Sequence, residues 1–304
     1  MNTVFSNRLV LAGIAAVGLA GSSQALEVEV EITNNSPTGG VVLTPVWVGF
    51  HDGSFDSYNG GLSAQVGLER LAEDGDNSVI SSDFLGGYTY IDNSGSSPVS
   101  ARVLTSQTTG RVDGTIGSPT GPGPIQPGET ETQRFTIGAD GSNRYFSYAS
   151  MILPSNDFFL ANGSPTAFDL ASLYDGVGEI TFQIGLPGTA NDAGTEQEDF
   201  DFAAPPLGGL QAFFPGVGFD GTDGQAAPNQ SSADNTLAIQ NVVGDPFADF
   251  LNADGLDLSQ LNFNDNSLYT NGIATITIRA VPEPGSLTVL GLGGLALISR
   301  RRRR

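Results

Sequence analysis

The sequence predicts an all-β fold, an antiparallel β-sandwich, and two observations lead to this prediction. The chain contains several short runs in which apolar and polar residues alternate, the pattern of a strand with one buried face. It also contains 41 glycines and 17 prolines in 304 residues, a content that favours turns between short strands over long helices. Seven or more short strands separated by turn-rich segments are typical of a sandwich or barrel.

The clearest strand pattern lies at residues 27–33, where acidic residues alternate with Val28, Val30 and Ile32. This alternation predicts one face in the core and the other in water. Residues 145–153 form an almost continuous apolar run, so we expect a buried strand that ends at Pro154. Strand patterns are also present at residues 41–50, 99–104, 132–137, 179–185 and 273–279.

Only residues 61–72 show a helical pattern, because four aliphatic residues there recur at roughly helical spacing before the acidic turn at 73–76. Long loops rich in glycine and proline are expected at 117–128 and 207–234. The strand patterns on both sides of these loops need partners to cover their apolar faces. We therefore predict one sandwich domain over residues 26–280, with one short helix.

The charge of the chain is strongly one-sided, and this excludes several classes of function. The sequence has 33 acidic and 12 basic residues, a formal net charge of −21, and every basic residue is an arginine. All but one of the acidic residues and only six of the arginines lie within residues 26–280. Such a body repels phosphate backbones, so nucleic-acid binding is excluded. The chain has no cysteine, which rules out disulfides, thiolate zinc sites and cysteine nucleophiles.

Residues 1–25 have the three parts of a secretory signal peptide. Arg8 supplies a positive charge, residues 9–20 form an apolar run, and Ser23 and Ala25 are small residues before a cleavage point at Leu26. We therefore expect the protein to be exported and its first 25 residues to be removed.

The C-terminal end of the chain has the features of a second targeting signal. Residues 282–284 form a short rigid motif, residues 287–298 are an apolar run, and residues 300–304 are all arginine. Twelve apolar residues span only about 18 Å as a helix, against a hydrocarbon core of roughly 30 Å. A permanent membrane anchor is therefore not expected, and the arginines are expected to stay on the cytoplasmic side.

Residues 281–304 resemble the PEP-CTERM sorting signal of Gram-negative bacteria, whose Pro-Glu-Pro is matched by Pro282, Glu283 and Pro284. The resemblance implies export across the inner membrane and transient membrane association through the tail. It also implies processing by an exosortase-type enzyme, after which the protein is expected at the cell surface or outside the cell.

The residues that enzymes use most often for catalysis are scarce in this sequence. The single histidine, His51, lies at a predicted strand end, where a turn or surface role is expected rather than a catalytic one. Paired carboxylates could serve a secreted carbohydrate hydrolase, but with so many acidic residues some pair always falls at a plausible spacing. We therefore expect no enzymatic activity, and the hydrolase is the least favoured alternative.

A cluster of five acidic residues lies at 191–201, directly after the predicted strand at 179–185, and includes Asp192 and Glu196. Carboxylates on one short loop repel one another unless a cation lies between them, and calcium is the hard, oxygen-seeking ion for such a site. A solvated acidic loop without a metal is the alternative interpretation.

A second acidic cluster, residues 73–78, invites comparison with an EF-hand loop but does not match it. Counted from Asp74, Val79 stands where the loop needs glycine and Leu85 stands where it needs glutamate. We expect this segment to be a polar turn that ends a helix.

The segment after Pro154 is the third candidate for a functional site. Asp157 follows a strand end, a position where an aspartate caps a turn or binds a metal. Phe158 and Phe159 come next, and we expect both rings to pack in the core, with an exposed contact surface as the alternative.

The runs SMILPSND (150–157), DAGTE (192–196) and GLERLAEDGD (67–76) resemble the spondin domain, the N-terminal module of F-spondin and mindin. The resemblance covers most of residues 26–280 and implies an antiparallel β-sandwich similar to the C2 domain. It also implies a bound Ca²⁺, which by position would be held by Asp157, Asp192 and Glu196, and a role in adhesion to matrix or cell-surface partners.

Together these features predict an exported, non-catalytic binding module of the cell surface or extracellular matrix, with a Ca²⁺-ordered loop site. Its expected partner is a polysaccharide or a surface or matrix protein. A structural biofilm or matrix protein without a specific ligand is the main alternative.

Overall fold

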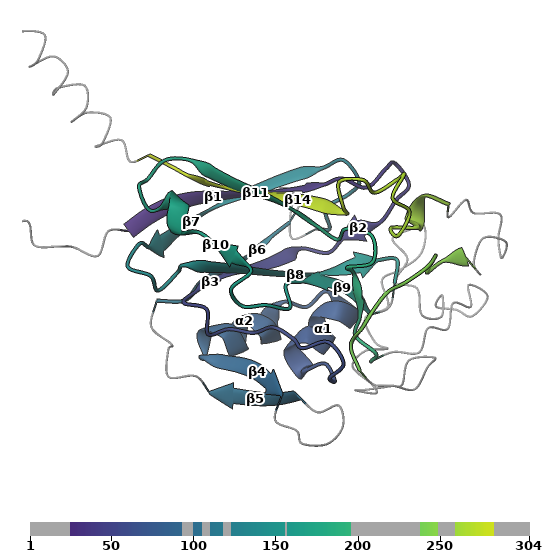
Figure 1. Cartoon of the computed structure of the whole chain (residues 1–304), viewed down its shortest axis with the longest axis horizontal. Helices are drawn as coiled ribbons and strands as arrows, with labels where there is room; N and C mark the ends of the chain where they lie inside the picture. The colour runs from purple at the N-terminus through teal and green to yellow at the C-terminus, as the bar shows by residue number, and fades with distance from the viewer. Residues whose placement is uncertain are drawn as a thin grey trace, which may run out of the picture.

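The computed structural model describes residues 25–92, 100–104, 110–117, 123–155, 157–195, 238–248 and 259–282. Two antiparallel sheets face each other, two α-helices cover the far side of the larger sheet, and a two-stranded hairpin lies beyond the helices (Figure 1). The predicted β-sandwich is confirmed. The sequence predicts one helix, however, whereas the described residues contain two.

The smaller sheet has four strands in the order β11-β14-β1-β7. Alternation along β1 is as predicted, because Val28, Val30 and Ile32 are fully buried while the intervening glutamates lie on the opposite face. There Arg279 pairs with Glu31 at 2.9 Å. Burying each aliphatic side chain contributes about 1.5–3 kcal/mol, which favours this register over a slipped one. The strands are β1 (Ala25–Asn34), β7 (Thr130–Gly138), β11 (Glu179–Ile184) and β14 (Ala274–Ala280).

The larger sheet has eight strands, six of them in the order β13-β12-β9-β8-β3-β6, with β2 and β10 also paired to β8. The single strand predicted at 41–50 is divided between β2 and β3, because Pro45 lies between them and lacks the N–H that a ladder needs. The strands are β2 (Val42–Leu43), β3 (Val46–His51), β6 (Val112–Ile116), β8 (Tyr145–Leu153), β9 (Phe158–Ala161), β10 (Phe168–Asp169), β12 (Asn191–Asp192) and β13 (Gln240–Asn241).

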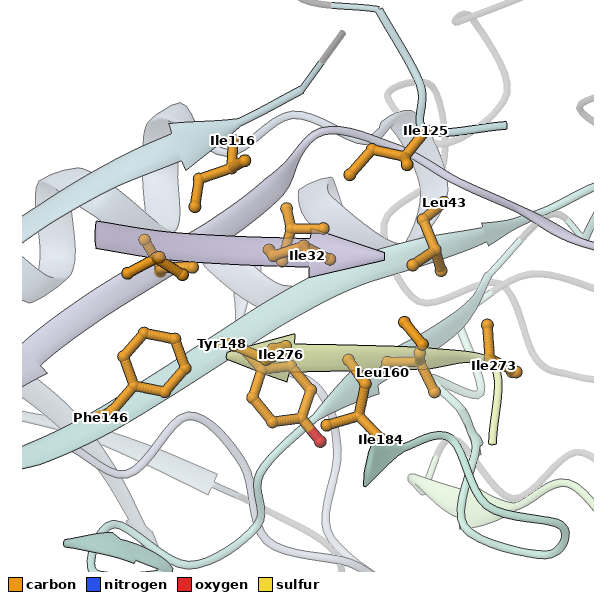
Figure 2. Close-up of a cluster of buried hydrophobic side chains, with 14 of the residues drawn as sticks. Ile32, Leu43, Ile116, Ile125, Phe146, Tyr148, Leu160, Ile184, Ile273 and Ile276 are labelled. Carbon is orange, nitrogen blue, oxygen red and sulfur yellow. The ribbon is translucent and has the colours of Figure 1, made fainter. Parts of the chain in front are cut away.

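The central strands β3 and β8 are buried on both faces, which explains why residues 145–153 are apolar almost throughout. Between the two sheets, Ile32, Phe146 and Ile276 belong to the main core (Figure 2). On the other side of the larger sheet a second core forms beneath the helices. The adjacent residues Phe158 and Phe159 belong to the main and the second core respectively, so the predicted burial of both rings is confirmed.

The helical layer consists of α1 (Val66–Asp74) and α2 (Ser78–Leu85), followed by the hairpin of β4 (Tyr88–Asp92) and β5 (Ser100–Leu104). The predicted helix at 61–72 therefore begins and ends later than expected. Its end at Gly75, where φ is 65°, confirms the predicted turn. The described residues also include the 3₁₀ turns η1 (Ala171–Leu173) and η3 (Ser259–Leu261).

Parts of the predicted organisation fall outside the described residues. These are residues 1–24 of the signal peptide and the loop predicted at 207–234. The loop predicted at 117–128 is described in part, and Ile125 in it is fully buried and forms a bridge to Leu43.

Candidate functional site

The predicted calcium ligands Asp157 and Asp192 lie in adjacent segments of the larger sheet. The antiparallel pairing of β9 and β12 places Asp192 opposite Phe158, the residue directly after Asp157. The N–H of Ala193 donates to the carbonyl oxygen of Asp157 at 3.2 Å. Strand register therefore brings together two acidic residues that are far apart in the sequence.

Both carboxylates accept hydrogen bonds from the same short loop, residues 193–195. Asp157 Oδ2 accepts the N–H of Thr195 at 3.0 Å, and Asp192 Oδ1 accepts the N–H of Gly194 at 2.6 Å. Gly194 has a φ of 67°, a conformation that favours glycine. Asp157 is fully buried, so its hydrogen bond to Thr195 is shielded from water. The two carboxylates thus fix the loop that follows β12.

Glu196, the third predicted ligand, lies outside the described residues. Over the described part of the chain, no group of three or more His, Cys, Asp or Glu side chains is placed to hold a metal ion. The structure therefore brings together two of the three predicted residues. Both are carboxylates, the ligand type that a hard cation such as Ca²⁺ prefers, so Asp157 and Asp192 fit the ion by their chemistry. The calcium site itself stays a prediction.

His51 is fully buried at the end of β3, so the surface role predicted for it is wrong, whereas its ring does bond to the turn that follows the strand. Its Nδ1 accepts the N–H of Gly53 at 3.0 Å, and its Nε2 lies 2.9 Å from the hydroxyl oxygen of Ser147. Burial, reinforced by the charge of Arg111, lowers the pKa of His51 to about 4. The ring is therefore neutral at pH 7 and carries its proton on Nε2.

The His51–Ser147 pair does not have the geometry of an activated serine. A general base must accept the serine proton, whereas here Nε2 carries the ring proton and donates to Ser147 Oγ. Ser147 is only 1% exposed, and its hydroxyl oxygen also accepts from Asn162 Nδ2 at 3.1 Å. The pair links β3 to β8 inside the fold.

Arg111 is a buried cation that sequence reasoning does not single out. Its Nη1 donates to the carbonyl oxygen of Phe84 at 2.7 Å, and its Nη2 donates to Ser54 Oγ at 2.8 Å. The guanidinium carbon lies 5.1 Å from the centre of the Phe84 ring. Burial lowers the pKa of Arg111. Arg111 stabilises the C-terminal end of α2, and no local sequence pattern reveals such a long-range contact.

The acidic cluster at 73–78 spans the end of α1, the turn at 75–77 and the first residue of α2, where the sequence predicts only a polar turn that ends a helix. Asp74 pairs with Arg70 at 3.3 Å, one turn earlier in α1. Asp76 Oδ1 accepts the N–H of Ser78 at 2.8 Å, at the start of α2. A helix does end in this turn, as predicted, although it ends later than expected and a second helix follows it directly.

The junction between the domain and the C-terminal tail is part of the folded sheet. The last strand, β14, lies between β1 and β11, and Val28 pairs with Ala280 at its end. The N–H of Val281 then donates to the carbonyl oxygen of Glu27 at 2.8 Å. The start of β1 and the end of β14 lie at the same end of the molecule (Figure 1). The predicted signal-peptide cleavage point and the start of the C-terminal tail therefore adjoin one end of the smaller sheet.

The comparisons with known proteins concern this tail. Residues 280–304 match the PEP-CTERM protein-sorting motif, so the match begins at the last residue of β14. Pro282 is described, whereas Glu283 and Pro284 lie outside the described residues. No curated protein matches the chain. No helix in the described part of the chain has the length and apolar character needed to cross a bilayer. The chain is thus an exported protein that carries a PEP-CTERM sorting signal, the signal that an exosortase-type enzyme processes.

Proposed function

We propose that the exported domain is a non-catalytic binding module of the cell surface or extracellular matrix, related to the spondin domain, whose loop site binds Ca²⁺. The supporting observation is the pairing of β9 with β12, which brings Asp157 and Asp192 to one loop. Glu196 would complete the ligand set. The expected partner is a polysaccharide or a surface or matrix protein.

Electrostatics favour a cation at this loop. The chain carries a net charge of −21, and the carboxylates of Asp157 and Asp192 accept hydrogen bonds from neighbouring residues of one loop. Like charges repel each other, and a divalent ion held between the two carboxylates would offset that repulsion. When bound, the ion would clamp the loop after β12 to the segment before β9.

We expect Ca²⁺ to raise the melting temperature of the exported protein and excess EDTA to lower it. An ion that binds only the folded state stabilises it by about 2.7 kcal/mol at a hundredfold excess over Kd. Asp192→Asn should abolish the response, because it removes the charge but keeps an oxygen that can accept the N–H of Gly194. Calorimetric melts with and without EDTA measure this difference.

Asp265→Asn provides the matched control for this experiment. Asp265 also accepts the N–H of the residue two positions ahead, Ser267, at 2.7 Å, but this exposed hydrogen bond lies outside the loop that follows β12. This variant should keep the full response to Ca²⁺. A wild-type melt that does not change in EDTA would show that the loop needs no metal.

Binding of a partner is tested separately, with a glycan array probed by the exported protein in the presence of Ca²⁺. Saturable binding to a class of glycans is the expected result for a binding module. Absence of binding to every glycan would favour a matrix-protein partner or the purely structural role. Release of new reducing ends from a bound glycan would identify a hydrolase instead.

A further inference from the structure

A cavity of about 660 Å³ lies between the α1–α2 connection and the edge of the larger sheet. Its volume is within the range of about 300–1,000 Å³ that is usual for small-ligand sites. One wall comes from the connection, with Asp74, Asp76 and Asn77, and another comes from Pro45 and Leu153 on the sheet side. Segments far apart in the sequence thus enclose one space, and it is separate from the loop of Asp157 and Asp192.

The polar wall of this cavity is held in place by the fold. Gly75 passes so close to Thr44 that a Cβ at this position would lie 2.8 Å from Thr44 Cγ2. Asn77 Nδ2 donates to the carbonyl oxygen of Pro45 at 2.7 Å and to Thr115 Oγ1 at 3.3 Å. Because the carbonyl of Pro45 can only accept, this contact fixes which end of the Asn77 amide is nitrogen. The wall is therefore preorganised.

The cavity has more hydrogen-bond acceptors than donors. The side chain of Asn77 is 9% exposed, and its Oδ1 has no hydrogen-bond partner among the described residues. A buried acceptor without a partner carries a free-energy cost that a ligand donor would remove. Asp76 adds a carboxylate, and the described lining contains no arginine. The ligand must therefore bring donors, and an anionic ligand would be repelled.

The remaining lining is a mixture of hydroxyls and apolar surface. Ser78, Ser81 and Thr115 carry hydroxyl groups that can donate or accept. Pro45, Pro124 and Leu153 present carbon surface to the same space. A molecule with many hydroxyl donors and a face of C–H groups matches both parts of the lining. Uncharged sugars have this chemistry, whereas phosphorylated and uronic sugars carry the wrong charge.

We propose that this cavity is a binding site for a short segment of an uncharged polysaccharide. The proposal rests on the proposed function, since it names the substrate class and the site of the binding module. Sugar hydroxyls donate to Asp76 and to Asn77 Oδ1, and the C–H face of the sugar packs against Pro45, Pro124 and Leu153.

The test is saturation-transfer NMR with the exported protein and two sets of oligosaccharides, one neutral and one containing uronic acids. Neutral oligosaccharides should bind and the uronic set should not. Ser81→Phe fills the cavity from α2 and should weaken binding at least tenfold. Ser82→Phe is the matched control, because this neighbouring helix residue is exposed and does not line the cavity. It should leave binding unchanged.

A second variant keeps the test independent of steric effects on folding. Asp76→Asn retains an oxygen that can accept the N–H of Ser78, and it replaces the other carboxylate oxygen with an NH₂ group, which removes the charge and one acceptor. It should weaken binding of neutral sugars about tenfold, since hydrogen bonds to charged groups are the stronger ones.

The possible outcomes distinguish failure of the proposed cavity site from failure of the proposed function. Binding of neutral sugars that is unchanged in Ser81→Phe and Asp76→Asn overturns this cavity as the site but leaves the proposed function standing. Preference for uronic oligosaccharides overturns the assigned ligand class. Failure of the wild-type protein to bind either set removes both this site and a polysaccharide partner.

Discussion

Replacing Trp47 with alanine is expected to lower the free energy of unfolding by about 3–5 kcal/mol, the usual cost of removing a large buried aromatic side chain. Trp47 is fully buried in β3 and faces the helical layer. Its ring lies 5.2 Å from the ring of Phe84 and 5.5 Å from that of Phe55. Its Nε1 donates to Asp113 Oδ2 at 2.9 Å. The substitution therefore opens a cavity and also leaves that carboxylate oxygen without this donor. Urea unfolding monitored by circular dichroism measures the effect.

Two further variants serve as comparisons for the destabilisation expected in Trp47→Ala. Trp47→Phe keeps most of the aromatic packing and removes the N–H donor, so it should cost clearly less than Trp47→Ala. Leu104→Ala changes a side chain that is 63% exposed and should stay within about 0.5 kcal/mol of wild type. Equal stability of Trp47→Ala and Leu104→Ala would mean that the helical layer does not pack on the sheet as described.

The strands that carry a clear periodicity could be predicted from the sequence. Residues 145–153 coincide with β8 at both ends, and the strand expected at 27–33 lies within β1. Both patterns arise because burial is regular along the whole strand: one face of β1 is buried, and β8 is buried on both faces. The two-residue strands β12 and β13 could not be predicted, because two residues have no period and form only where a neighbouring strand offers its edge.

The helical layer shows a different limit of sequence reasoning. Helix α2 is eight residues long, begins three residues after Gly75, and contains three serines, so its sequence resembles a continuation of the polar turn. Short helices are marginal in isolation, and the burial of Ile80 and Phe84 against the sheet stabilises this one. The packing of α2 against the sheet therefore determines this helix, and the local sequence does not indicate that packing.

The candidate site was predictable in its residue types but not in its surroundings. Asp157 and Asp192 are recognisable as acidic residues at strand ends, and the structure adds that register brings them to one loop. His51 and Arg111 are both buried, yet nothing beside them in the sequence indicates this. Their burial depends on the second core, and that core exists only because helices cover the far face of the larger sheet.

Lowering the pH is expected to decrease the free energy of unfolding, because His51 binds a proton more readily in the unfolded chain than in the folded protein. The pKa of His51 is about 4 in the folded protein, because burial disfavours the charged ring, and 6.5 without that environment. Between these values the unfolded chain binds a proton that the folded protein does not. The contribution is therefore complete above pH 6.5, and it is lost as the pH falls to about 4. The difference between the two pKa values corresponds to roughly 3 kcal/mol.

Asp56 is expected to oppose His51 over almost the same pH range. Burial raises the pKa of Asp56 from 3.8 to about 6, although a hydrogen bond from Asn59 at 3.1 Å lowers it. A raised pKa makes the folded state bind a proton that the unfolded chain releases. The stability from Asp56 is therefore present below pH 3.8 and lost as the pH rises through 6. Its size is smaller than that of His51, because the Asp56 carboxyl is partly exposed and screened by solvent.

Single variants should separate the opposing effects of His51 and Asp56 on the pH dependence of stability. In His51→Gln, stability should fall less than in wild type, or rise, as the pH falls from 6.5 to 4, since the His51 contribution is gone and the Asp56 contribution remains. In Asp56→Asn, the same acidification should lower stability more steeply than in wild type, because the His51 contribution of up to about 3 kcal/mol is no longer opposed by Asp56. The double variant should lose both contributions. Urea unfolding at pH 4.5, 5.5 and 7.0 measures the slopes, which do not depend on the absolute stability of each variant. A His51→Gln protein with the slope of wild type would show that the buried imidazole titrates normally, and the neutral His51–Ser147 link would then be incorrect.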